Sequence, residues 1–147
     1  MPPDLKAIQH YCAYQERCHS EVRNKLLELN FRGLELEEAI ASLIADNFLN
    51  EERFARSYIR GKFRMKQWGR RKIVTELKKK KVSDYCIRKG LLEIDEDEYR
   101  NTLQLLFDKK VVELKSETNT WIRKQKVQRY LIQKGYEPDM VSELLKS

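Results

Sequence analysis

Apolar residues recur along most of the chain at intervals of three and four. Leu5, Ile8 and Cys12 fall on one side of a helix, and Leu36 and Ile40 fall on one side of another. Residues on one helical face stand three or four apart, whereas a strand places every second residue on one face. No stretch alternates apolar and polar residues for long enough to favour a sheet. The pattern therefore predicts an all-α protein.

One arrangement of apolar residues occurs three times. In each copy two apolar residues stand four apart, and a third follows five positions after the second. The copies are Val22-Leu26-Phe31, Ile73-Leu77-Val82 and Val127-Leu131-Tyr136. A helical stretch with aromatic residues precedes each copy, and a short amphipathic stretch follows it. Because self-similarity at a regular interval indicates tandem units, we predict three three-helix repeats at residues 1–49, 50–93 and 94–147.

Residues that start or stop helices stand near these repeats. Gly33 is expected to end the helix before it, and Gly69 precedes the middle helix of the second repeat. Gly135 is expected to end the middle helix of the third repeat, and Pro138 to occupy the first turn of the last helix. The acidic run at residues 93–98 is expected to link the second and third repeats and to supply carboxylates to a helix N-terminus.

The composition is that of a charged protein with enough apolar residues for a core. Of 147 residues, 36% are charged and 41% are hydrophobic, so disorder is not expected. Lys and Arg number 30 against 23 Asp and Glu, which gives a net charge of +7. That surplus favours an acidic partner, with nucleic acid ahead of a membrane.

Nothing in the sequence predicts export or a membrane anchor. Residues 1–6 contain no positive region followed by an apolar run, so no signal peptide is expected. The longest nearly apolar stretch, at residues 39–45, is too short to span a bilayer. Cys12, Cys18 and Cys86 are odd in number and form no CxxC pair, which is typical of reduced thiols. We therefore expect a cytoplasmic protein.

No group of residues has the spacing of a catalytic or metal site. The phosphate-binding, dinucleotide-binding, nucleophile-elbow and zinc-protease motifs are all absent from the sequence. His10, Cys12, Cys18 and His19 lie near one another, but their intervals match no structural zinc site. The preferred interpretation is that they are partly buried helix residues. We therefore expect no enzyme activity, no metal and no cofactor.

The most informative stretch comprises residues 53–81. It holds 13 basic residues and a single acidic one, Glu76, within 29 positions. Arg56, Arg60 and Arg64 stand one helical turn apart and form a stripe on one face. This stretch is either an ordinary solvated face or a surface that binds an anionic partner. The second interpretation is favoured because stacked like charges repel each other and few carboxylates stand nearby in the sequence.

The candidate partner-binding or nucleic-acid-binding residues are Arg53, Arg56, Arg60, Lys62, Arg64, Lys66, Trp68, Arg70, Arg71, Lys72, Lys78 and Lys79. Trp68 stands among these cations and either caps the core or exposes its ring to a base or a protein partner. A second, weaker basic group begins near Trp121, to which the same two interpretations apply. Its members are Arg123, Lys124, Lys126, Arg129 and Lys134.

Two linked motifs carry a family resemblance. Residues 48–58 have the sequence FLNEERFARSY, and residues 68–77 have the sequence WGRRKIVTEL. Together they resemble the core of the RecX family of RecA regulators, in which an acidic Arg-Phe-Ala motif precedes a basic helix and a Gly…Ile…Glu-Leu motif. The resemblance extends to the first repeat and, more loosely, to the third. The chain departs from the family at Asn47, where a glycine is common, and at Lys80, which fills the place of a Lys-Gly turn.

The resemblance implies an elongated, curved array of three tandem three-helix repeats with a regulatory, non-enzymatic role. Proteins of this family bind RecA, usually as the filament on single-stranded DNA, and restrain strand exchange, ATP hydrolysis and LexA co-cleavage in recombination, DNA repair and the SOS response. Some also bind DNA directly. We accordingly expect a monomer that binds RecA and, as a second partner, DNA.

Charge by itself favours a different class of protein. In that alternative the chain is a basic helical protein that acts mainly through nucleic acid, with short helices that work like helix-turn-helix units. Pull-down of RecA in the absence of DNA distinguishes the two hypotheses, because only the first predicts binding.

Overall fold

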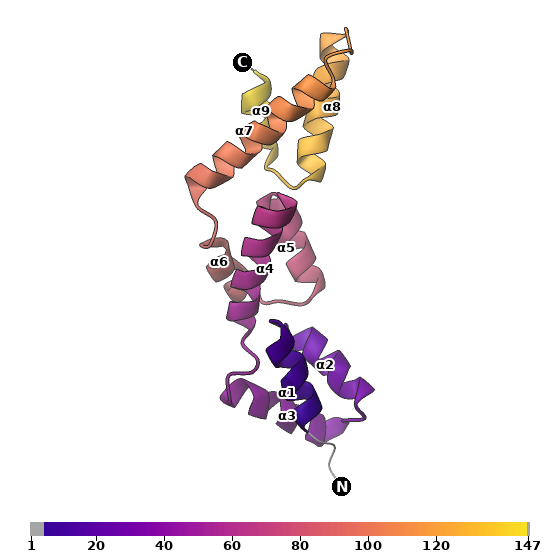
Figure 1. Cartoon of the computed structure of the whole chain (residues 1–147), viewed down its shortest axis with the longest axis vertical. Helices are drawn as coiled ribbons and strands as arrows, with labels where there is room; N and C mark the ends of the chain where they lie inside the picture. Colours follow the sequence, from indigo (N-terminus) through magenta and orange to yellow (C-terminus); the bar gives the residue numbers. More distant parts are fainter. Residues whose placement is uncertain (1–4, 147) are drawn as a thin grey trace. The chain divides into compact units, whose positions relative to one another are not determined.

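The computed structural model describes residues 5–146 and is built from α-helices (Figure 1). Nine helices follow one another in this range, with no strand among them. The prediction of an all-α protein is therefore confirmed. Residues 1–4, on which the expectation about a signal peptide partly depends, lie outside the described range. Within that range, no helix has the length and apolar character needed to cross a membrane.

The helices group in threes along the sequence. The first three are α1 (Leu5–Tyr14), α2 (His19–Glu28) and α3 (Gly33–Ala45). The next three are α4 (Glu51–Lys66), α5 (Arg70–Lys79) and α6 (Asp84–Leu91). The last three are α7 (Glu96–Glu113), α8 (Thr120–Gln133) and α9 (Pro138–Leu145). The recurring apolar pattern thus corresponds to three tandem three-helix repeats.

The residues that define the apolar pattern are buried in all three copies. The exposed fraction of Leu26, Leu77 and Leu131, which lie on the middle helices, is 0%. The residues five positions later are also buried, and these are Phe31, Val82 and Tyr136. Burying one such side chain stabilises a fold by roughly 1.5–3 kcal/mol. The three middle helices therefore anchor their repeats in equivalent ways.

Each middle helix ends in the same left-handed turn. Asn30, Lys81 and Gly135 have φ values of 72°, 64° and 106° and stand four residues after the buried leucines. In all three turns the next residue donates its N–H to the leucine carbonyl, at distances between 2.9 and 3.1 Å. This is the hydrogen bond of a Schellman cap, which favours glycine because a Cβ is strained at positive φ.

One expectation about these turns was wrong. Gly33 does not end α2, because Asn30 makes that turn and Gly33 is the first residue of α3. The strained position in the second repeat is Lys81, whereas Lys80 stands one residue before it. Asn47, where the family commonly has glycine, also has a positive φ of 63° and follows the end of α3. Asparagine tolerates this conformation better than most residues do.

The helices pack into two compact units, each with its own core. The first unit comprises the chain up to Tyr58 together with Leu77–Gly90, and the second comprises Ile59–Glu76 together with the chain from Leu91 onward. The core of the first unit gathers apolar residues of α1, α2 and α3, with Ile8 and Val22 fully buried. The core of the second unit centres on aromatic rings, which the next subsection describes.

Replacing Lys81 by glycine should stabilise the protein. A left-handed backbone at lysine costs about 1–2 kcal/mol. Part of this gain is offset because glycine loses more chain entropy on folding, so Lys81→Gly should raise the free energy of unfolding by about 1 kcal/mol. Urea unfolding measures the change. Asn30→Gly is the matched control at the equivalent turn and should change the free energy by less than half as much. Equal effects at the two positions would contradict this account.

Candidate functional site

Within the second unit, the loop between α4 and α5 meets the loop between α8 and α9 backbone to backbone. The N–H of Gly69 donates to the carbonyl of Lys134 at 2.7 Å, and the N–H of Arg71 donates to the carbonyl of Gly135 at 2.9 Å. A Cβ on Gly69 would lie 2.3 Å from the carbonyl carbon of Gly135, which is closer than any real contact. We call this contact the glycine joint. It requires glycine at residue 69.

Buried tyrosines support the glycine joint on both sides. Tyr99 and Tyr136 are both fully buried with ring centroids 5.2 Å apart, and Phe63 lies 5.7 Å from Tyr99. The Tyr136 hydroxyl donates to the carbonyl of Gln67 at 2.9 Å. The Tyr99 hydroxyl donates a hydrogen bond to Glu137 and accepts one from the backbone N–H of Arg70 at 3.0 Å. Burial is the main cause that raises the pKa of both hydroxyls.

Arg70 belongs to this supporting structure. Its guanidinium carbon lies 3.8 Å from the centre of the Tyr99 ring. The same group forms ion pairs with Glu96 at 2.9 Å and with Glu137 at 3.5 Å. Three partners therefore hold the side chain against the second unit. We assign Arg70 a structural role, although it stands among the predicted binding residues.

Arg53 is likewise engaged, within the first unit. Its Nε lies 2.7 Å from both carboxylate oxygens of Glu16. One Nη donates to the backbone carbonyl of Asn47 at 3.0 Å, and the other donates to the Asn47 side chain at 3.1 Å. The arginine thereby holds the turn that follows α3. Its place in the resemblance motif has a structural explanation.

The arginine stripe of α4 is paired with carboxylates. Arg56 lies 3.2 Å from Glu52, within one turn of the same helix. Arg60 lies 3.3 Å from Glu93, and Arg64 lies 3.7 Å from Glu98. The expectation that few carboxylates would be near the stripe was therefore wrong. The acidic run at residues 93–98 supplies the partners of Arg60 and Arg64, and it also gives α7 the acidic first turn that was expected.

Several cations of the second unit form no ion pair with any described residue, and four of them lie around the glycine joint. We call Lys66, Arg71, Lys72 and Lys134 the joint cluster, because they surround the glycine joint. Arg71 and Lys72 line a groove of about 510 Å³ between the start of α5 and the end of α8. The Nζ of Lys134 donates to the backbone carbonyl of Lys66 at 3.0 Å. Burial, followed by the nearby charges of Lys72 and Lys109, lowers the pKa of Lys134.

Lys134 is the member of this cluster that sequence reasoning missed. It stood in the weaker basic group near the C-terminus, apart from the main basic stretch. Only the folding of the α8–α9 loop onto Gly69 brings it to Lys72. A signal was available, because Lys134 precedes the capping Gly135 as Lys80 precedes Lys81. Aligned repeats would have placed it at the joint.

Trp68 lies half-buried beside the joint cluster. The ammonium groups of Lys62 and Lys72 lie 5.0 and 4.5 Å from the centre of its ring. Both distances fall within the range of a cation–π interaction. The ring is thus neither fully buried core nor freely exposed, whereas Trp121 has 69% of its surface exposed. Lys78 and Lys79 are exposed at the end of α5 in the first unit.

The first unit has a joint of similar construction with different chemistry. Ser20 stands six residues before Leu26, as Arg71 does before Leu77, and its hydroxyl donates to the carbonyl of Lys80 at 2.7 Å. The neighbouring groove of about 390 Å³ includes Glu51 among its lining residues. Arg23, which also lines it, is paired with a glutamate at 2.7 Å. This joint of the first unit therefore combines a carboxylate and a paired arginine with lysines, whereas no carboxylate lines the groove beside the glycine joint.

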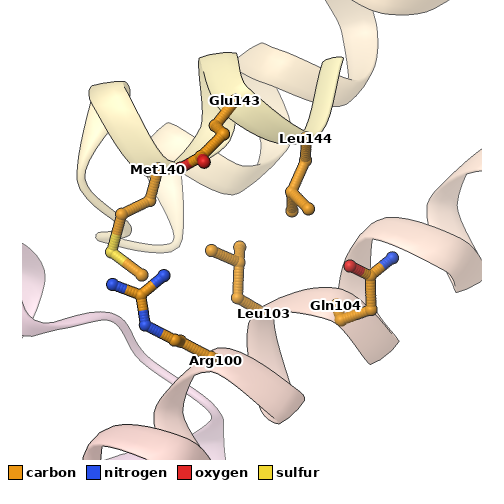
Figure 2. Close-up of a pocket in the computed structure, with 6 residues that line it drawn as sticks. All are labelled: Arg100, Leu103, Gln104, Met140, Glu143 and Leu144. Atoms are coloured by element: carbon orange, nitrogen blue, oxygen red, sulfur yellow. The ribbon is translucent and has the colours of Figure 1, made fainter. Parts of the chain in front are cut away.

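The third repeat also has a small opening between α7 and α9 (Figure 2). Its volume is about 240 Å³. Figure 2 shows Leu103 and Leu144 facing each other across it, with Arg100 beside Met140 at one end. None of the predicted binding residues lines it. Across residues 5–146, no three His, Cys, Asp or Glu side chains gather as a metal site requires, and all three cysteines are free thiols.

These features define a class of protein: a basic protein of tandem three-helix repeats with a cation cluster at the contact between two repeats. Comparison with known proteins identifies the family. Residues 50–91 match the RecX second three-helix domain, and residues 96–145 match the RecX third three-helix domain. The chain belongs to the RecX family, which is a family of regulatory proteins.

Individual relatives agree with this assignment. The chain is 34% identical over 131 residues to the regulatory protein RecX of Clostridium perfringens (strain 13 / Type A), which covers 88% of this chain but 61% of that protein's length. It is 30% identical over 139 residues to the regulatory protein RecX of Haemophilus influenzae (strain PittGG), covering 94% of this chain and 90% of that protein. The crystal structure of RecX from Lactobacillus salivarius superposes with a TM-score of 0.86 at 24% identity, covering 97% of this chain and 92% of that one. At this identity the superposition shows the fold alone.

A methyl group at the glycine joint should destabilise the protein. Gly69→Ala places Cβ against the backbone of Gly135, and we expect a loss of about 3 kcal/mol, at the upper end for overpacked sites. Gly61→Ala is the matched control, because nothing lies within 4 Å of its Cβ and it sits inside α4. The control should be neutral or stabilising by up to about 1 kcal/mol. Thermal and urea unfolding compare the two, and similar effects would refute the joint.

The buried tyrosines should make the protein sensitive to alkaline pH. Their pKa is raised in the folded state, so the stability that their neutral hydroxyls contribute is complete below pH ~10, the unfolded value, and is lost as the pH rises further. Each tyrosine should add a slope of about −1.4 kcal/mol per pH unit above that point. Tyr136→Phe should remove one such contribution. Urea unfolding between about pH 8 and about pH 11 measures both slopes, and identical slopes would exclude this tyrosine as a cause.

Proposed function

We propose that this protein binds RecA, chiefly as the filament on single-stranded DNA, and restrains strand exchange, ATP hydrolysis and LexA co-cleavage. The observation that carries the proposal is the match of residues 50–91 and 96–145 to RecX domain models. The resemblance of the two sequence motifs to a family of RecA regulators supplies the partner. We further propose that the protein acts in the cytoplasm as a monomer, without cofactor and without catalysis of its own.

A regulator of this kind needs a binding surface rather than a reactive group. Filament turnover requires neighbouring protomers to separate, and a ligand that contacts several protomers resists that step. Tandem repeats suit such a ligand because they extend one type of surface along the chain. Cations without carboxylate partners can then attract the phosphates of the bound DNA or acidic surface of the filament.

The joint cluster, which joins Lys66, Arg71 and Lys72 of the predicted binding set to Lys134, best fits this role. Its side chains have no carboxylate partner among the described residues, so they lose no ion pair when an anion binds. Lys62 and Trp68 extend the proposed surface within the second unit, and we propose that Lys78 and Lys79 provide a further contact from the first unit. The arginine stripe contributes less in this proposal, because each of its members would first have to give up a glutamate.

Direct action on nucleic acid is the second candidate function. It is favoured by the position of Trp68 beside Lys72, with the ammonium 4.5 Å from the ring centre. Proteins that bind single-stranded DNA combine cations for phosphates with aromatic rings for bases. Retention of RecA in a pull-down without DNA supports the first function, and retention only when DNA is present supports the second.

Neutralising the joint cluster should impair inhibition more than neutralising the stripe. Arg71→Gln/Lys72→Gln and Arg60→Gln/Arg64→Gln remove the same charge, so they form a matched pair. We expect the first variant to need at least about tenfold more protein to inhibit the DNA-dependent ATPase of RecA, a change of about 1.4 kcal/mol, and the control to need less than about threefold more. Melting temperatures of both should stay near that of the unmodified protein, since exposed charges contribute about 0–1 kcal/mol each.

The same variants separate the two functions in a salt series. If the cluster contacts phosphates, each lost contact on single-stranded DNA should flatten the log–log salt dependence by about 0.7. Weaker DNA binding with unchanged binding to DNA-free RecA would assign the cluster to nucleic acid. Unchanged ATPase and strand exchange at saturating unmodified protein would refute the regulatory function.

A further inference from the structure

The far end of the α7–α8 hairpin, residues 107–126, carries apolar residues without a complete core. Six large apolar residues occur in this segment, and none of them is fully buried. They are Phe107, Val111, Val112, Leu114, Trp121 and Ile122. Val112 and Trp121 have exposed fractions of 62% and 69%. The proposed function does not use this apolar hairpin end.

The contact between α7 and α8, here called the α7–α8 seam, is only partly covered because α9 is much shorter than α7. α7 has 18 residues and α9 has 8, so the two helices are about 27 and about 12 Å long at 1.5 Å per residue. Where α9 packs, the repeat has a closed core in which Leu103, Leu131 and Val141 are buried. Beyond Leu145, at which α9 ends, the described chain provides no third helix.

A groove occupies this position. Its volume is about 270 Å³, and its apolar lining comes from all three helices: Phe107, Val111, Val127 and Leu145. Thr120, Arg123 and Lys124 complete the lining on the α8 side. An apolar floor with charged groups at its edge fits a ligand that is itself amphipathic.

The charge of the hairpin end defines the ligand further. Six basic residues and three acidic residues occur between positions 107 and 126. Two of the acidic residues are already paired, Glu113 with Lys110 at 3.2 Å and Glu117 with Lys126 at 3.6 Å. Arg123 and Lys124, by contrast, form no ion pair with a described residue, and the buried Nε of Arg123 has no hydrogen-bond acceptor among them.

We propose that this groove docks an acidic amphipathic helix of the partner protein, laid along the α7–α8 seam beyond the end of α9. Its apolar face takes the place of a third helix, and its carboxylates pair with Arg123 and Lys124. The inference rests on the proposed function in one respect, namely that RecA supplies this helix. Trp121 lies exposed on the same hairpin end, where it packs against the docked helix.

Two other occupants fit the groove less well. A second copy of this chain would bring two basic rims together, and the net charge of each chain is +7. Like charges would then oppose the contact. Nucleic acid would engage Lys124 and Trp121, but it would leave the aliphatic floor of Val111, Val127 and Leu145 without an apolar partner. Both occupants remain outcomes of the experiment.

The first measurement uses synthetic peptides and the full chain. The sequence has two tryptophans, so Trp68→Phe leaves Trp121 as the only indole. The probe is a helical peptide with leucines along one face and glutamates elsewhere, and its control carries lysines in place of the glutamates. We expect the acidic peptide to bind and shift the Trp121 emission to the blue, with at least tenfold weaker binding of the basic peptide. Equal binding of both peptides, or binding of neither, would overturn the proposal.

Charge reversal at the rim provides the matched variants. Lys124→Glu should weaken binding of the acidic peptide at least tenfold, whereas Lys115→Glu, an exposed lysine outside the groove lining, should change it less than threefold. RecA binding should follow the same order. A dimer that Lys124→Glu dissolves would assign the groove to a second copy, and selective loss of single-stranded DNA binding would assign it to nucleic acid. Either result overturns the proposal.

The two proposals can fail separately. If the unmodified protein does not bind RecA at all, the proposed function fails, and the peptide titration still decides the chemistry of the groove. If RecA binds and Lys124→Glu leaves that binding intact while weakening the peptide, the assignment of the helix to RecA is overturned.

Discussion

The contact between the Gly69 and Gly135 backbones sets the geometry of the second unit. Peptide groups can approach this closely only where both residues lack a Cβ, and the hydrogen bond from Gly69 to the Lys134 carbonyl fixes the register of the two loops. The cation cluster and the buried tyrosines both depend on this register. It brings Lys134 to Lys72, and it places Tyr99 and Tyr136 under the loops as a buried support.

The fold determines which basic side chains of this protein have carboxylate partners. The basic stretch looks uniform along the chain, yet Arg56, Arg60 and Arg64 pair with carboxylates whereas Lys66, Arg71 and Lys72 do not. The reason is local. α7 starts beside α4 and carries the acidic run, so Arg60 and Arg64 are neutralised. The joint cluster surrounds the glycine joint, where the nearby Glu137 is already engaged by Arg70 and Tyr99. A uniform charge run thus becomes one balanced face and one unbalanced one.

Helical periodicity and the threefold apolar pattern were sufficient to predict the all-α fold and its repeats, because buried positions such as Leu26, Leu77 and Leu131 recur at fixed places. The helix-capping residues were predicted less well: asparagine at residue 30 signals a left-handed turn less strongly than the nearby Gly33, and lysine at residue 81 does not signal one. The structural roles of Arg53 and Arg70 could not be predicted, because they depend on partners distant in sequence. Gly69 was expected to precede a helix, which it does, but its contact with Gly135 explains its identity.

The division of the chain into compact units has a consequence for folding cooperativity. The middle repeat is shared: residues 59–76 belong to the core that contains Tyr99 and Tyr136, whereas residues 77–90 belong to the core of the first repeat. The free energy of unfolding of a repeat protein is the sum of the stabilities of its repeats and of the interfaces between neighbours. Here the boundaries between the compact units fall within α4 and α5, so the interfaces include parts of both helices. The middle repeat therefore has no core that it can complete alone. Each half of the middle repeat is folded against a different neighbouring repeat. Removal of the first repeat would therefore unfold residues 77–90, and removal of the third would unfold residues 59–76.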